Sequence, residues 1–229
     1  RQIVLRANQS IEEFGPIFDA LGLLDPSDPE QMRANLEIRK ENSPRGAEAR
    51  RKLREAIELK NYEFNAHGVE LGHRYRSRAV VPDGTPEPAY TRDPELYYHP
   101  TTWPGARLPH AWLEVRGRKV STLDLAGKGR FALFTGIGGE AWMEAAREVS
   151  ARTGVEIAAY TIGPARDAHD IYDDWARARE VEESGCVLVR PDAHVAWRAH
   201  QAAGDATGEL RRVMETLLGV LEPVGGGAA

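Results

Sequence analysis

The sequence predicts an α/β protein in which a helical N-terminal segment and a proline-rich connector precede a β-α-β-α-β-β-α domain. Three observations support this prediction. Apolar residues recur at three- and four-residue spacing at both ends of the chain, which is typical of helices. Prolines are dense between residues 82 and 109, which excludes a long helix there. Beyond residue 130, short apolar runs alternate with helical patterns, which favours an α/β domain.

Composition excludes several classes of protein. The 229 residues, 41% hydrophobic and 28% charged, are typical of a soluble globular chain. A net charge of −5 provides no basic surface for nucleic acid or an anionic membrane, and no apolar run approaches the roughly 20 residues that span a bilayer. The single cysteine, Cys186, excludes an internal disulfide and favours the cytoplasm. Because the chain opens on Arg1 and not on Met, we expect it to begin partway through a longer polypeptide or after a cut.

Residues 1–65 predict three helices. The first carries an apolar stripe over residues 3–21, with a break or kink at Gly15-Pro16. The second begins at the N-cap Asp28, in a capping box completed by Gln31. The third runs from Ser43-Pro44 to about residue 61, and its charged side is interpreted as solvated. Its buried side is expected to carry Leu53, Ile57 and Phe64.

Residues 66–118 predict a connector with short strands. The chain from residue 62 to 77 is expected to be irregular and to enter an edge strand. Prolines then recur at short intervals: Pro82, Pro86, Pro88, Pro94, Pro100, Pro104 and Pro109. This density favours extended chain laid over another surface.

Residues 119–222 predict the α/β domain, and residues 223–229 a frayed tail. The expected strands are Phe131–Thr135, Val155–Ile162, Cys186–Val189 and Val195–Arg198, of which the last two form a hairpin. The helix after the first strand ends at Gly154, and its expected buried stripe is Trp142, Ala145, Ala146 and Val149. A second helix is expected to begin at Asp167 and to bury Ile171, Trp175 and Ala178. A last helix, which buries residues from Leu210 to Leu221, is expected to stop at Pro223.

This order of elements resembles the thioredoxin fold, but the redox residues of that fold are missing. A thioredoxin-type enzyme needs a low-pKa cysteine at the N-terminus of the first helix. The corresponding stretch, Thr135–Glu140, has no cysteine and therefore no Cys-x-x-Cys. Cys186 lies in an apolar strand, where we interpret it as an inert buried thiol, and Ser184-Gly185 stands where a cis-proline is usual.

The glycine turn has a second interpretation. Gly136, Gly138 and Ala141 follow the spacing of the dinucleotide-binding fingerprint, with Glu156 about 20 residues further on. The alternative is that these glycines only allow a tight turn and close packing of helix on sheet. We favour the packing role, because Glu156 begins its strand, whereas a ribose ligand belongs at the carboxyl end.

Other candidate sites are weak. The seven histidines include no metal-binding spacing, and His67 and His73 are interpreted as ordinary polar residues. Asp173-Asp174 is expected to be a solvent-facing acidic pair on a helix and not an acid/base dyad.

Nine stretches spread over the chain carry a resemblance to a known family. They are Arg1–Val4, Ser10–Phe18, His67–Glu70, Arg74–Ser77, Pro100–His110, Ser121–Leu125, Phe131–Trp142, Asp170–Ala176 and Gly185–Arg198. In these stretches the sequence resembles the C-terminal portion of FAD-dependent aromatic hydroxylases, the phenol monooxygenases among them.

The resemblance implies a parent enzyme that hydroxylates a phenol ortho to its hydroxyl group, with FAD, NADPH and O2. It implies that residues 1–65 belong with the flavin-binding part, and that residues 119–222 provide support and homo-oligomer contacts. It assigns no catalytic, cofactor-binding or metal-binding residue here, so no cofactor is expected on this chain alone. Two alternatives stay open, a free-standing dimerisation or scaffold module and a nucleotide-binding enzyme that uses the glycine turn.

Overall fold

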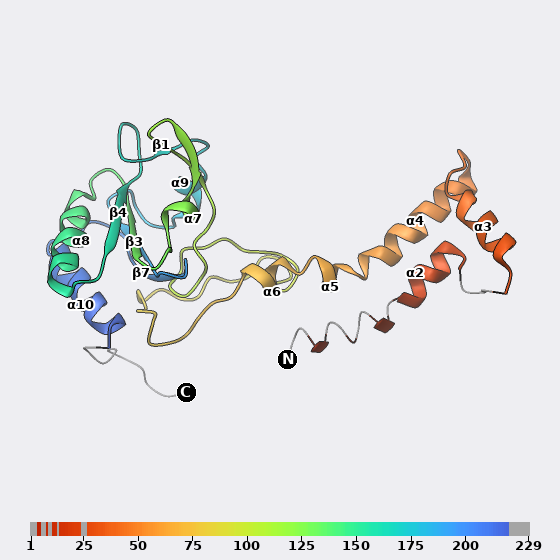
Figure 1. Cartoon of the computed structure of the whole chain (residues 1–229), viewed down its shortest axis with the longest axis horizontal. Coiled ribbons are helices and arrows are strands. Elements are labelled where there is room, and N and C mark those ends of the chain that lie inside the picture. The colour runs from red at the N-terminus through yellow and green to blue at the C-terminus, as the bar shows by residue number, and fades with distance from the viewer. Residues whose placement is uncertain (1–3, 6–7, 9–10, 13, 24–26, 220–229) are drawn as a thin grey trace. The chain divides into compact units, whose positions relative to one another are not determined.

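The computed structural model describes residues 4–5, 8, 11–12, 14–23 and 27–219 (Figure 1). The chain forms two compact units. The helical unit comprises residues 1–70 and 92–98, and the α/β unit comprises residues 71–91 and 99–229. The expected tail, 223–229, and residues 220–222 lie outside the described residues. The last helix ends earlier than expected, at Leu217, and Leu218 is 42% exposed. In the N-terminal helical pattern, residues 1–3, 6–7, 9–10, 13 and 24–26 also lie outside the described residues.

The helical unit is built from short capped helices. They are α2 (Phe14–Leu21), α3 (Pro29–Ile38), α4 (Pro44–Glu58), α5 (Asn61–Phe64) and α6 (His67–Leu71), whose last residue lies in the α/β unit. The predicted N-cap Asp28 is confirmed, because its side chain accepts a hydrogen bond from the backbone N–H of Gln31. Ser43 caps the start of α4 in the same way, since its side chain accepts from the N–H of Gly46. The Gln31 side chain bonds instead to Asn35, so the expected reciprocal capping box is not formed.

The expected buried side of the third helix is wrong. Ile57 is 48% exposed and Phe64 64% exposed, and the buried residues of α4 are Gly46 and Ala56. Leu53, the remaining residue of the expected buried side, is partly buried. The apolar spacing therefore marks a helical face but does not show how far that face is covered. The expected irregular chain around residue 67 is also wrong, since α6 occupies it.

The connector is extended, as its prolines predict. Residues 72–91 and 99–111 contain no helix or strand beyond isolated bridges. Their backbone bonds to the outer edge of the last strand of the main sheet, β7 (Val195–Ala199). Val81 N–H donates to Ala196 at 2.8 Å, and Gly105 N–H donates to Val195 at 2.8 Å.

The main sheet of the α/β unit has the order β4-β3-β6-β7. Its strands are β3 (Phe131–Thr135), β4 (Ile157–Thr161), β6 (Cys186–Val189) and β7. β3 runs parallel to β4 and antiparallel to β6, and β6 and β7 form the predicted hairpin. The helices α8 (Glu140–Thr153) and α10 (Ala206–Leu217) complete the layer beside it. Gly154 ends α8 in the left-handed conformation, at φ +71°, as predicted.

A second sheet, of order β2-β1-β5, was not predicted as a sheet. It comprises β1 (Trp112–Val115), β2 (Arg118–Ser121) and β5 (His169–Asp170), with α7 (Thr122–Leu125) directly after β2. β5 replaces the start of the helix expected at Asp167, whose carboxylate instead accepts the N–H of Thr161 at 3.0 Å. The helix α9 (Asp174–Ala178) begins later, although Trp175 is buried as expected.

Two hydrophobic clusters lie on opposite faces of the main sheet. One joins the sheet to α8 and α10 through Trp142, Leu188, Trp197, Leu210 and Met214. The other joins the opposite face to β1 and α9 through residues such as Phe134, Leu113 and Trp175. Figure 1 shows α8 and α10 together on one side of the sheet and α7, α9 and β1 on the other. The buried stripe predicted for α8 is confirmed in full.

Candidate functional site

The glycine turn between β3 and α8 is packed against its own chain. Gly136 donates its N–H to the carbonyl oxygen of Glu183 at 2.8 Å. A Cβ at Gly136 would lie 2.6 Å from that oxygen, and one at Gly139 would overlap the Thr135 hydroxyl. Gly138 adopts φ +85°, a conformation that favours glycine. Close approach and turn geometry therefore account for the three glycines.

Neighbouring chain occupies part of this turn. The segment Glu183–Gly185 packs against Gly136 and Gly138, whose backbone a pyrophosphate would have to approach. The Trp142 indole donates to the Ser184 carbonyl at 3.1 Å, and the Thr135 hydroxyl donates to the Gly185 carbonyl at 2.7 Å. Glu156 lies at the N-terminal end of β4, 67% exposed, and pairs with Arg130 at 3.3 Å. These contacts and the position of Glu156 support the packing role of the glycines over a Rossmann-type cofactor site.

The thiol of Cys186 is buried in β6 with 0% exposure. Burial raises the pKa of Cys186 far above its ordinary value, because the thiolate would lose its hydration. The side chain belongs to the cluster formed with α8 and α10, and in the sheet Cys186 pairs with Thr135, the residue before the glycine turn. A neutral, solvent-excluded thiol is a poor nucleophile, which agrees with its interpretation as inert.

The remaining sequence candidates are scattered. The His73 ring stacks on Tyr75 with centroids 6.4 Å apart, and His67 lies in α6. Asp174 forms an exposed ion pair with Arg177 at 2.6 Å, and Asp173 is the N-cap of α9. Within the part of the chain that the structure describes, no group of three His, Cys, Asp or Glu side chains could hold a metal ion. No described helix is long and apolar enough to cross a membrane.

A buried polar cluster around Arg198 was missed by sequence reasoning. We call it the Arg198 cluster; its members are Arg198, Asp83, Thr85, Thr102 and Glu180. The guanidinium donates to Asp83 Oδ2 at 2.5 Å and to Glu180 Oε2 at 2.7 Å. It also donates to the hydroxyls of Thr102 and Thr85, at 3.0 and 3.2 Å. The side chains of Arg198 and Asp83 are 4% and 2% exposed.

Charge and hydrogen bonding favour the ionised form of Asp83. Burial raises the pKa of this carboxyl, but hydrogen bonds from Thr85 and Arg198 outweigh burial and hold the pKa below its ordinary value. Glu180, at φ +53°, accepts from the Thr101 hydroxyl at 2.7 Å and from the Thr102 N–H at 3.2 Å. The cluster thus ties two parts of the connector and the loop before β6 to the strand β7.

Most of the hydrogen-bonding capacity of Arg198 is used within the protein. A hollow of about 450 Å³ lies beside the cluster, lined by residues that include Asp83, Arg198, His200 and Glu209. Each of the three guanidinium nitrogens donates to a protein oxygen, and four of the five N–H groups are used in this way. Asp83 and Arg198 are 115 positions apart in the sequence, so no local spacing indicates the pair. The cluster holds the connector in place.

Known proteins match this chain over nearly its whole length. The family model described as "Aromatic-ring hydroxylase, C-terminal" matches residues 101–220. The chain is 50% identical over 220 residues to the 2,4-dichlorophenol 6-monooxygenase of Delftia acidovorans, covering 96% of this chain and 38% of that protein. It is also 50% identical over 205 residues to the phenol 2-monooxygenase of Pseudomonas sp. (strain EST1001), covering 90% of this chain and 34% of that protein.

Solved structures show the same partial coverage. The flavin-dependent monooxygenase PieE, in complex with FAD and substrate, superposes with a TM-score of 0.77 at 52% identity. The match covers 96% of this chain and 38% of PieE. A ternary complex of aklavinone-11 hydroxylase with FAD and aklavinone superposes with a TM-score of 0.60 at 32% identity, covering 76% of this chain and 34% of that protein. The chain therefore spans little more than a third of each of these relatives.

Proposed function

This chain belongs to the aromatic-ring hydroxylase C-terminal family, and from that membership we propose that it is the C-terminal part of an FAD-dependent monooxygenase of phenols. The identity of 50% over 96% of the chain with 2,4-dichlorophenol 6-monooxygenase carries the proposal. The reaction of the whole enzyme would be ortho-hydroxylation of a phenol or chlorophenol with NADPH and O2. The partner of this chain would be the flavin-binding part of the same enzyme.

The division of labour within that enzyme is part of the proposal. We propose that residues 1–229 contribute support and no reacting group, and that FAD, NADPH and the phenol bind through the flavin-binding part. The packed glycine turn, the buried Cys186 and the internally hydrogen-bonded Arg198 cluster support a structural role. Residues 1–65 would then belong with the flavin-binding part, 66–118 would connect, and 119–222 would form the supporting domain.

We further infer that the supporting domain is thioredoxin-like and that the enzyme is a cytoplasmic homo-oligomer. The strand order β4-β3-β6-β7, with one parallel and two antiparallel pairings, supports the fold assignment. The single cysteine supports a reducing compartment.

Two preparations test the proposal. The purified 229-residue chain should show no visible flavin absorbance and no NADPH oxidation with 2,4-dichlorophenol. The same chain joined to the flavin-binding portion of the Delftia acidovorans relative should bind FAD and convert the phenol to a catechol. FAD bound to the isolated chain at about one per chain would overturn the division of labour. A joined protein that binds FAD but never hydroxylates phenols would overturn the substrate assignment.

A further inference from the structure

The helical unit exposes apolar side chains that folded proteins usually bury. Phe14 and Phe18 on α2 are 44% and 45% exposed, and their ring centroids lie 6.1 Å apart. At the end of α4 and in the turn after it, Ile57 is 48% and Leu59 39% exposed, and Phe64 of α5 is 64% exposed. We call these five side chains the apolar surface.

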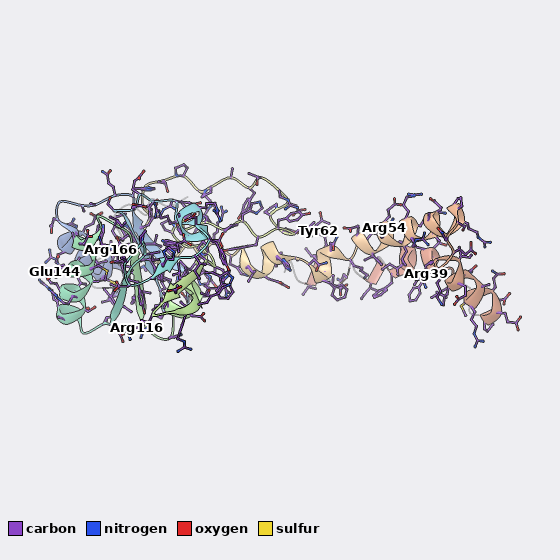
Figure 2. The ribbon with its side chains drawn as sticks, turned by 90° about the horizontal axis from the view of Figure 1, so that it is seen from above. Arg39, Arg54, Tyr62, Arg116, Glu144 and Arg166 are labelled. Atoms are coloured by element: carbon purple, nitrogen blue, oxygen red, sulfur yellow. The ribbon has the colours of Figure 1, made fainter. Side chains whose placement is uncertain are left out.

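Contacts within the unit place the two parts of this surface near each other. The Lys60 ammonium lies 3.7 Å from the centroid of the Phe14 ring, so α2 meets the chain directly after α4. Tyr62, labelled in Figure 2, donates its hydroxyl to Asp93 at 2.7 Å. Both contacts fix the backbone that carries the apolar surface and leave its hydrophobic side chains exposed.

The helical unit has little core of its own to hold these helices. No described residue of α2 or α3 is buried, and the buried apolar side chains of the described part of the unit are Ala56 and Ala66. A hollow of about 670 Å³ lies among α2, α3 and α4. Isolated helices of 8 and 10 residues, the lengths of α2 and α3, are marginal in water without tertiary packing. Exposed apolar side chains gathered on such helices indicate a surface that another structure covers.

We propose that the flavin-binding part of the enzyme covers the apolar surface. This inference rests on the proposed function and names the residues through which the two parts assemble. PieE matches 96% of this chain, the helical unit included, yet the match covers only 38% of PieE, a protein solved with FAD. The larger share of such a relative is therefore available to cover helices that have little core of their own.

Substitutions on the apolar surface test the proposal by binding. The 229-residue chain would be co-expressed with the flavin-binding portion of the Delftia acidovorans relative, and the complex isolated and titrated. We expect a one-to-one complex, which Phe14→Ser/Phe18→Ser and, separately, Ile57→Ser each weaken roughly tenfold or more. The matched control is Ile137→Ser, because Ile137 is 41% exposed but belongs to the α/β unit. Circular dichroism establishes that each variant keeps its helices.

Each outcome bears on the proposal. Equal affinity for the parent chain, both surface variants and the control would overturn it. So would a dimer of the isolated chain by light scattering that only the surface variants dissociate, because a second copy would then be the occupant. An affinity that falls for Ile137→Ser and not for the surface variants would assign the occupant to the α/β unit and overturn the proposal. A complex that forms as expected but lacks hydroxylase activity would leave the surface in place and count against the proposed function alone.

Discussion

The helical unit and the α/β unit bury their apolar side chains to different extents. In the α/β unit, Phe134 is 1% exposed and Trp142 is 0% exposed, in two clusters that sandwich a sheet. In the helical unit, Phe18 is 45% exposed on a helix without a buried residue. The first region specifies its own core, whereas the second carries the apolar pattern of a core and lacks the partner surface. Matched substitutions in the two units test whether they differ in this way.

The largest difference is expected for one substitution made in each unit. Phe134→Ala should lower the free energy of unfolding of the α/β unit by about 3–5 kcal/mol, because it leaves a cavity among Tyr160, Trp175 and the sheet. Phe18→Ala should change the stability of the isolated chain by less than about 0.5 kcal/mol. Urea unfolding followed by circular dichroism measures both. Equal losses would mean that α2 is packed as tightly as the sheet.

Charged residues should show the same contrast at a somewhat smaller magnitude. Arg198→Met leaves the buried Asp83 carboxylate without its cation and should lower the free energy of unfolding by about 3 kcal/mol. The loss is expected to be no larger because the second carboxylate, Glu180, is partly solvated. Arg51→Met on α4 removes two exposed ion pairs, to Glu48 and Glu55, and should have no measurable effect on unfolding. Similar denaturation midpoints for the two variants would contradict a role for the Arg198 cluster in stability.

Two glycines should respond with opposite signs to the same change. Gly136→Ala forces a methyl group to within 2.6 Å of the Glu183 carbonyl and should destabilise the α/β unit by about 1–3 kcal/mol. Gly15 lies in α2 with open space around it, so Gly15→Ala should stabilise the helical unit by about 0.5 kcal/mol. Thermal unfolding of both variants gives the signs. A stabilising Gly136→Ala would restore the possibility that the turn is open to a ligand.

The smallest expected effect is a pH dependence that comes mainly from the α/β unit. The pKa of Asp83 is lower in the folded state, so its contribution to stability is present above the unfolded pKa of about 3.9 and is lost as pH falls through the folded pKa. Denaturation midpoints between about pH 6 and pH 3 should fall less steeply for Asp83→Asn than for the parent chain. The control is Glu48→Gln, which should keep nearly the parent slope: Arg51 lowers the pKa of Glu48 too, but their ion pair is solvent-exposed and adds little to stability. A parent slope retained by Asp83→Asn would exclude Asp83 as its source.

The sequence predicts best where a feature is local. The strand Phe131–Thr135 and the helix stripe from Trp142 to Val149 follow from apolar spacing and glycine punctuation, and the structure confirms both. The strand β5 was missed because its pairing partner, β1, lies more than 50 residues away. The exposure of Ile57 and Phe64 was missed because periodicity identifies an apolar face and not what covers it.

The same distinction applies to the candidate site. The sequence itself shows that the turn Thr135–Glu140 has no cysteine. The burial of Cys186 could be predicted from its apolar neighbours, and the structure confirms it. The Arg198 cluster could not, since it joins a proline-rich segment, a loop and a strand that the sequence separates widely. A lone arginine in an apolar strand is the one signal that could have indicated it, because such a charge must be paired.

The connector along β7 has a consequence for how this protein can be divided. An uncovered edge strand presents free backbone groups that template pairing with other chains, and hence aggregation. Here Val81, Gly105 and Ala106 bond to that edge, each at 2.8 Å. A domain excised at residue 119 would lose all three and open the edge to solvent. A shortened version that keeps residues 79–109 should therefore be soluble on expression, whereas a version that begins at residue 119 should form inclusion bodies.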